Sequence, residues 1–126
     1  MDGRPLRKEL QSTEVFLRGL REEVSVSRDY GLPVTVLVAV VEGGWSAEDL
    51  RKALDVLRFA DLATLLEPRE LAVALPNTTP EGAGAVEERL RKVVPGVRLA
   101  SAAYRQDETA ESLLARARRM AAGSGG

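Results

Sequence analysis

The sequence contains no cysteine and no histidine. Their absence excludes disulfide bonds, metal sites built on thiolate or imidazole groups, and catalysis by a Ser-His or Cys-His pair. Any bound metal would therefore need hard carboxylate ligands, as Mg²⁺ does.

An excess of charge and a long apolar run are also missing. Lys plus Arg total 18 and Asp plus Glu total 19, so the formal net charge is −1. This balance argues against a general nucleic-acid binder, which normally carries a clear basic excess. The longest apolar run, residues 34–41, is far shorter than the roughly 20 residues of a membrane-spanning helix. Because the N-terminus also lacks the apolar region of a signal peptide, we expect a cytoplasmic protein without membrane contact.

The composition that is present is typical of a folded globular protein. Hydrophobic residues make up 44% and charged residues 29% of 126 residues, which is enough for one core. We predict a single domain over residues 1–126, with an N-terminal helix at 5–30, a core at 33–121 and a flexible tail at 122–126.

The N-terminal helix carries an apolar seam in alternating steps of four and three residues. Its members are Leu6, Leu10, Leu17, Leu20 and Val24, with Thr13 in register. One interpretation is an amphipathic helix that packs on its own domain, and the other is the seam of a parallel homodimer. Gly31 and Pro33 predict the end of the helix.

The remaining segments alternate between strand and helix patterns. Residues 34–41 are apolar on both faces, as expected of a central strand covered on both sides. Strands are predicted at 62–66, 71–75 and 97–104, and helices at 47–60, 80–94 and 109–121. After the first helix the order is β-α-β-β-α-β-α, which predicts an α/β (α+β) fold: a split βαβ sandwich with a mainly antiparallel central sheet flanked by helices.

Several segments follow one another in a characteristic order: R-D-Y-G-L-P at 28–33, R-F-A-D at 58–61, E-P-R-E-L at 67–71, the strand and helix of 71–94, and L-L-A-R-A at 113–117. In this order they resemble the GGDEF domain, the catalytic module of diguanylate cyclases. The resemblance covers about residues 12 to 121. It implies the GGDEF, or nucleotide-cyclase-like, fold. No single segment is specific, and the collinear order carries the assignment.

The residues that the resemblance assigns to catalysis are substituted. In active members, a strand-end aspartate and the acidic signature turn hold two Mg²⁺ ions. Here Val40 stands at the position of that aspartate, and Glu42 stands at the second acidic position. The turn reads Glu67-Pro68-Arg69-Glu70, in which Arg69 replaces an acidic ligand and Pro68 lacks an N–H donor. The substrate-binding segment before R-x-x-D is shorter by about fourteen residues. We therefore predict no catalytic residue, no metal, no cofactor and no enzyme activity.

The R-x-x-D motif is retained. In the family this motif forms the inhibitory site for the product, cyclic di-GMP, and the spacing from Arg58 to Glu67 fits that arrangement. The resemblance therefore implies that Arg58 and Asp61 bind this ligand. An arginine fork can donate to guanine O6 and N7, and a carboxylate can accept from guanine N–H groups. The other interpretation is a salt bridge at a helix end with no ligand.

Two main functions compete. The first is a catalytically inactive receptor that binds cyclic di-GMP through Arg58 and Asp61 and acts on an unidentified protein partner. The second is a protein-interaction or dimerisation scaffold that no longer binds nucleotide. A third is a nucleotide site in the former catalytic cleft. Further candidates are Trp45, as a stacking or a packing residue, and a basic patch of Arg116, Arg118 and Arg119.

Overall fold

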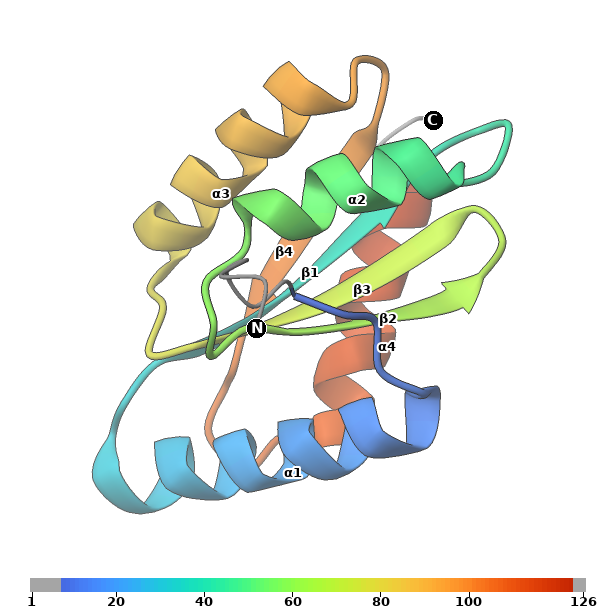
Figure 1. Ribbon diagram of the computed structural model, residues 1–126. Coiled ribbons are helices and arrows are strands. Elements are labelled where there is room, and N and C mark those ends of the chain that lie inside the picture. The colour runs from blue at the N-terminus through green and yellow to red at the C-terminus, as the bar shows by residue number, and fades with distance from the viewer. Residues whose placement is uncertain (1–7, 124–126) are drawn as a thin grey trace, which may run out of the picture.

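The computed structural model describes residues 8–123. It contains four helices and four strands (Figure 1). In chain order these are α1 Thr13–Tyr30, β1 Val34–Val40, α2 Ala47–Val56, β2 Leu62–Glu67, β3 Glu70–Pro76, α3 Pro80–Val93, β4 Arg98–Ala103 and α4 Ala110–Gly123. The predicted order of elements is confirmed.

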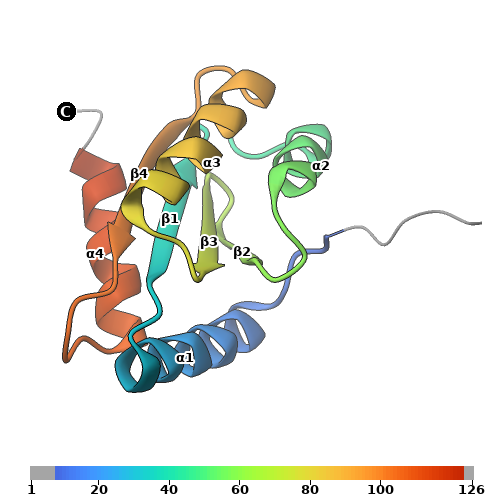
Figure 2. The ribbon, with the colours of Figure 1, turned by 90° about the vertical axis from the view of Figure 1, so that its left-hand side faces the viewer.

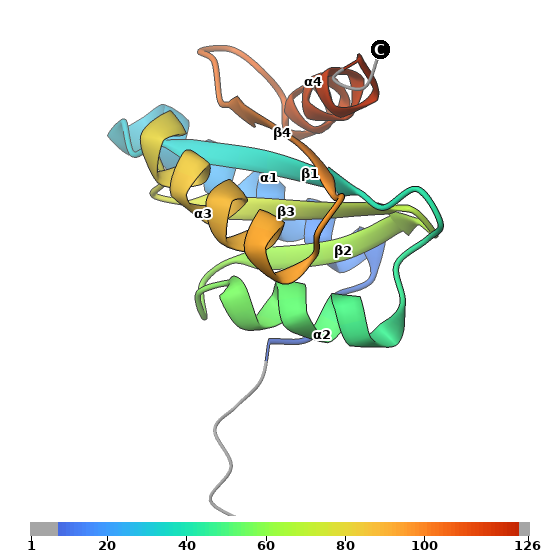
Figure 3. The same ribbon diagram turned by 90° about the horizontal axis from the view of Figure 1, so that it is seen from above.

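The four strands form one antiparallel sheet in the order β2-β3-β1-β4. Seen from above, β2 and β4 lie at the two edges (Figure 3). This is the sheet order of a split βαβ unit, in which β1 and β3 are the inner strands. Every residue of β1 is buried, as its continuous apolar run predicted.

Helices cover both faces of the sheet (Figure 2). Alternate residues of β1 divide between two cores, because successive side chains of a strand point to opposite faces. Val36 and Val38 pack with α1 and α4, and Leu37 and Ala39 pack with α2 and α3. The sandwich therefore has three layers, and both faces of the sheet are used for packing.

The first helix starts later than its sequence pattern predicted. It begins at Thr13, where the Ser12 hydroxyl accepts a hydrogen bond from the Val15 N–H at 3.2 Å. This cap fixes the point at which the helix begins. Residues 8–12 instead run beside β2, where Gln11 N–H donates to the Ala63 carbonyl at 2.8 Å. The predicted helical start at residue 5 lies outside the described residues.

The apolar seam of α1 packs on its own sheet. Leu20 is fully buried, Val24 is 5% exposed, and Leu17 packs against the same core. The homodimer-seam interpretation is therefore wrong at Leu20 and Val24, whose side chains fill the core of this chain. At Leu17, which is only partly buried, it stays a prediction. Leu10 precedes the helix and is partly exposed, and Leu6 lies outside the described residues. Within residues 8–123, no helix combines the length and the apolar character that crossing a membrane requires.

Candidate functional site

The R-x-x-D motif forms a turn between α2 and β2. The helix ends at Val56, two residues before Arg58, so the predicted helix to residue 60 is four residues too long. The Asp61 N–H donates to the Arg58 carbonyl at 3.1 Å. The carboxylate of Asp61 in turn accepts from the Arg58 backbone N–H at 2.7 Å. Main chain and side chain therefore both close this turn.

The two side chains of the motif form an ion pair. Arg58 Nη2 donates to Asp61 Oδ1 at 2.8 Å, and Arg58 Nε donates to the same oxygen at 3.2 Å. The Asp61 side chain is fully buried, whereas that of Arg58 is 53% exposed. In this arrangement the carboxylate is turned toward Arg58 and holds it in place. Direct contact of Asp61 with a ligand stays a prediction.

The same guanidinium also joins the turn to the loop after β3. Arg58 Nη2 donates to the Pro76 carbonyl at 2.9 Å and contacts the Thr78 hydroxyl at 2.7 Å. The Thr78 carbonyl accepts from the Thr35 hydroxyl of β1 at 2.9 Å. The orientation of Arg58 is thus fixed by its contacts with Asp61, Pro76 and Thr78. No residue in 8–123 bonds to its Nη1. In the sequence, Thr78 was matched only as part of the segment 71–94, which gave no sign of this role.

Lys8 supports the turn from the N-terminal segment, and nothing in the sequence pattern predicted this role. Its Nζ donates to the carbonyls of Phe59 and Asp61 and lies 5.6 Å from the centroid of the Phe59 ring. Burial lowers the pKa of Lys8, and the charge of Asp61 partly opposes that effect.

The degenerate signature turn joins β2 and β3. Glu67 and Glu70 belong to the strands, so the connecting residues are Pro68 and Arg69 alone. Arg69 Nη1 donates to Glu42 Oε1 at 3.1 Å. Two acidic side chains at this turn are therefore each next to a cation: Glu42 pairs with Arg69, and Glu70 accepts from Arg118 Nη2 at 3.3 Å. That hydrogen bond raises the pKa of Arg118.

These residues do not fit a pair of Mg²⁺ ions. Val40, at the position of the strand-end aspartate, is apolar and only 8% exposed. Arg69 places a positive charge in the turn, and the carboxylates of Glu42 and Glu70 are paired with arginines. No group of three or more acidic side chains within the described residues is arranged to hold a metal ion.

An open hollow remains beside this turn. It is lined by Gly43, Gly44, Trp45, Ser46, Leu65, Leu66, Glu67 and Pro68. The only ionisable group among these residues is a carboxylate, which repels phosphate. The lining therefore gives no support to a nucleotide site in the former cleft. Trp45 packs against the α2–α3 core and donates from its indole N–H to the Ala39 carbonyl at 3.2 Å, as its packing interpretation predicted.

Two arginines of the C-terminal patch, Arg116 and Arg118, are each paired with a carboxylate. Arg116 is 15% exposed and bonds to Glu108 at 2.8 Å and to the Ala103 carbonyl at 2.6 Å. Arg118 pairs with Glu70. The patch predicted from the sequence is thus divided: Arg116 is part of the packing of α4, whereas Arg118 and Arg119 are exposed.

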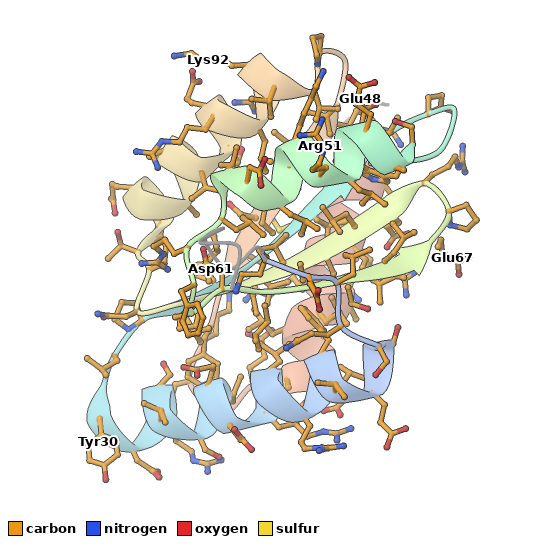
Figure 4. The ribbon with its side chains drawn as sticks, viewed as in Figure 1. Tyr30, Glu48, Arg51, Asp61, Glu67 and Lys92 are labelled. Carbon is orange, nitrogen blue, oxygen red and sulfur yellow. The ribbon has the colours of Figure 1, made fainter. Side chains whose placement is uncertain are left out.

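The R-x-x-D turn and the signature turn lie at opposite ends of β2. Figure 4 shows Asp61 before the strand and Glu67 at its end. Six steps along an extended strand correspond to about 20 Å. A small ligand bound at Arg58 would therefore not touch the signature turn.

No family model and no curated protein matches this sequence. Solved structures do match by shape. The GGDEF domain of YfiN (TpbB) from Pseudomonas aeruginosa superimposes with a TM-score of 0.81 at 16% identity, over 91% of this chain and 89% of that chain. The GGDEF domain of DgcB from Caulobacter crescentus, solved in complex with c-di-GMP, gives 0.79 at 15% identity over 99% and 90%.

A third match is the diguanylate cyclase SiaD from Pseudomonas aeruginosa, solved in complex with its activator SiaC. Its TM-score is 0.67 at 24% identity, over 94% of this chain and 58% of SiaD. The resemblance inferred from collinear sequence segments thus agrees with the three-dimensional arrangement. The chain has the fold of the GGDEF domains of diguanylate cyclases.

Proposed function

We propose that this chain is a catalytically inactive GGDEF-fold domain that binds cyclic di-GMP at Arg58 and acts on a protein partner. The observation that carries the proposal is the state of Arg58. Its guanidinium is held from one side by Asp61, Pro76 and Thr78, and its other edge faces solvent. The Nη1 group of this preorganised guanidinium keeps its N–H donors for a guanine acceptor or for a phosphate oxygen.

The absence of catalysis is supported by the chemistry of the former metal site. A two-metal reaction needs carboxylates that are free to bind cations. Here Glu42 and Glu70 are paired with arginines, and the strand-end position is the buried Val40. We expect no cyclic di-GMP when the protein is incubated with GTP and Mg²⁺. Product formation above a protein-free control would overturn this part of the proposal.

Two of the similar structures support a binding role. DgcB was solved with c-di-GMP and SiaD with an activator protein. By analogy, a GGDEF fold without catalysis can still serve as a ligand-dependent contact for another protein. The analogy is one of fold, and the argument for a site on this chain rests on Arg58.

One observation favours the alternative, a scaffold that does not bind nucleotide. The buried Asp61 and its bonds to Arg58 are sufficient to explain the R-x-x-D motif as a structural latch. A latch would need no ligand, because every polar atom of the carboxylate already has a partner within the turn.

Calorimetric titration with cyclic di-GMP separates the two functions. The decisive variant is Arg58→Lys, which keeps a cation beside Asp61 but removes the fork. Arg51→Lys is the matched control, since Arg51 lies on the exposed face of α2 with a long ion pair to Asp55 at 4.0 Å. Micromolar or tighter binding, weakened at least ten-fold by Arg58→Lys alone, would support the receptor. No binding by the wild-type protein would refute the receptor and leave the scaffold.

A further inference from the structure

Phe59 is the most exposed large hydrophobic side chain within residues 8–123. Its exposed fraction is 86%, whereas the only other phenylalanine, Phe16, is fully buried in the core. The ring therefore contributes little to the packing of this domain. The exposed ring lies inside the candidate binding motif, between Arg58 and Asp61.

The backbone that carries this ring is held firmly. The turn is closed by bonds between Arg58 and Asp61, including the 2.7 Å bond from the Arg58 N–H to the Asp61 carboxylate. Lys8 Nζ donates to the carbonyls of Phe59 and Asp61 as well. The ring is thus presented to solvent by a fixed main chain, so that little conformational entropy would be lost when a ligand packs on it.

Two cations flank the ring. Arg58 precedes it directly and has a half-exposed guanidinium. The Lys8 ammonium lies 5.6 Å from the ring centroid, a distance suited to a cation–π contact. An aromatic face with adjacent cations is the chemistry that single-stranded nucleic-acid sites use, where the base stacks and the phosphate is neutralised.

We propose that Phe59 is the base-stacking residue of the site at Arg58, with a guanine of the ligand packed on its ring. The inference rests on the proposed function, because it assigns a specificity-determining contact to the same ligand. It assigns a separate task to each residue: Arg58 bonds to the base edge or phosphate, Asp61 positions Arg58, and Phe59 supplies the planar surface.

The test is titration of cyclic di-GMP into two variants of the full chain. Phe59→Tyr keeps the aromatic face, and Phe59→Leu keeps the apolar character without it. We expect Phe59→Leu to weaken binding about ten-fold and Phe59→Tyr to change it less than three-fold. Both variants should melt at the wild-type temperature, since the ring is exposed. Tyr30→Leu is the control, because Tyr30 is an aromatic residue with 77% exposure at the end of α1.

The outcomes distinguish the two proposals. Wild-type binding with unchanged affinity in Phe59→Leu overturns the stacking role and leaves the proposed function intact. No binding by the wild-type protein overturns the proposed function and this inference together. Equal weakening in Phe59→Leu and Tyr30→Leu also overturns the stacking role, because a ring outside the R-x-x-D turn would then matter as much.

Discussion

Asp61 accepts hydrogen bonds from both the backbone N–H and the guanidinium of Arg58, at 2.7 and 2.8 Å, although none of its side chain reaches solvent. A buried carboxylate is stable only when its charge is paired and its lone pairs are satisfied. The turn before β2 supplies both requirements. The motif that looks like a ligand site in the sequence is therefore also a structural element of the fold.

Replacing Asp61 should destabilise the protein strongly. We expect Asp61→Ala to lower the free energy of unfolding by about 2 to 3 kcal/mol, because it removes charge-assisted hydrogen bonds from the closed turn. Urea denaturation measures the change. Asp55→Ala is the matched control, since the Asp55–Arg51 pair is exposed on both sides and should change stability by less than about 0.5 kcal/mol. Equal effects of the two variants would contradict the structural role of Asp61.

The apolar seam of α1 should contribute to the free energy of unfolding and not to the oligomeric state. Leu20 is fully buried, so Leu20→Ala should cost about 2 to 5 kcal/mol of unfolding free energy. Val15, on the same helix and 41% exposed, gives a control whose replacement by Ala should be nearly neutral. Light scattering at matched concentrations should show one oligomeric state for all three proteins. A lower mass for Leu20→Ala at unchanged stability would restore the dimer seam.

Acid should release the ion pair that holds α4. The hydrogen bond from Arg116 holds the pKa of Glu108 below its usual value of 4.5. A lowered pKa in the folded state means that this stabilisation is complete above about pH 4.5. It is lost as the pH falls through the lower folded-state pKa, where the carboxylate takes up a proton.

Two Gln variants test this dependence. Both side chains of the Glu108–Arg116 pair are mostly buried, so Glu108→Gln should cost about 3 kcal/mol at pH 7 and progressively less as the pH falls through the folded-state pKa. Glu111 also has a lowered pKa, caused by Arg21, but that pair is half exposed. Glu111→Gln should therefore cost less than about 1 kcal/mol. Urea midpoints in a series of buffers from pH 7 downward measure both. A Glu108→Gln deficit that does not shrink as the Glu108 carboxylate takes up its proton, followed by NMR in the wild-type protein, would refute the assignment.

The sequence predicted the elements better than it predicted their ends. The apolar run at 34–41 was sufficient to identify a central strand, because only a strand covered on both faces needs no polar side. The start of α1 was misplaced, because the apolar period extends back through Leu10, whereas the helix begins only after the Ser12 cap. The capping hydrogen bond of Ser12 outweighs the apolar pattern at that position. The spacing of apolar residues cannot show such a bond.

The candidate site was likewise predicted only in part from the sequence. The spacing of Arg58, Asp61 and the signature turn identified where a ligand site would lie, and the substitutions Val40 and Arg69 indicated lost metal ligands. The sequence did not reveal the contacts of Lys8, Thr78 and Pro76 with the R-x-x-D turn. These residues are far apart in the chain, and only the sheet order brings them together.

By itself, the sequence determined the order of helices and strands, the lack of imidazole and thiol chemistry, and the collinear motifs of the GGDEF fold, because these depend on residue type and local spacing. Only the tertiary structure decided which atoms are accessible. It buried Asp61, exposed Phe59 and turned the leucine seam of α1 inward, because burial depends on which surfaces of distant segments meet when the sheet forms.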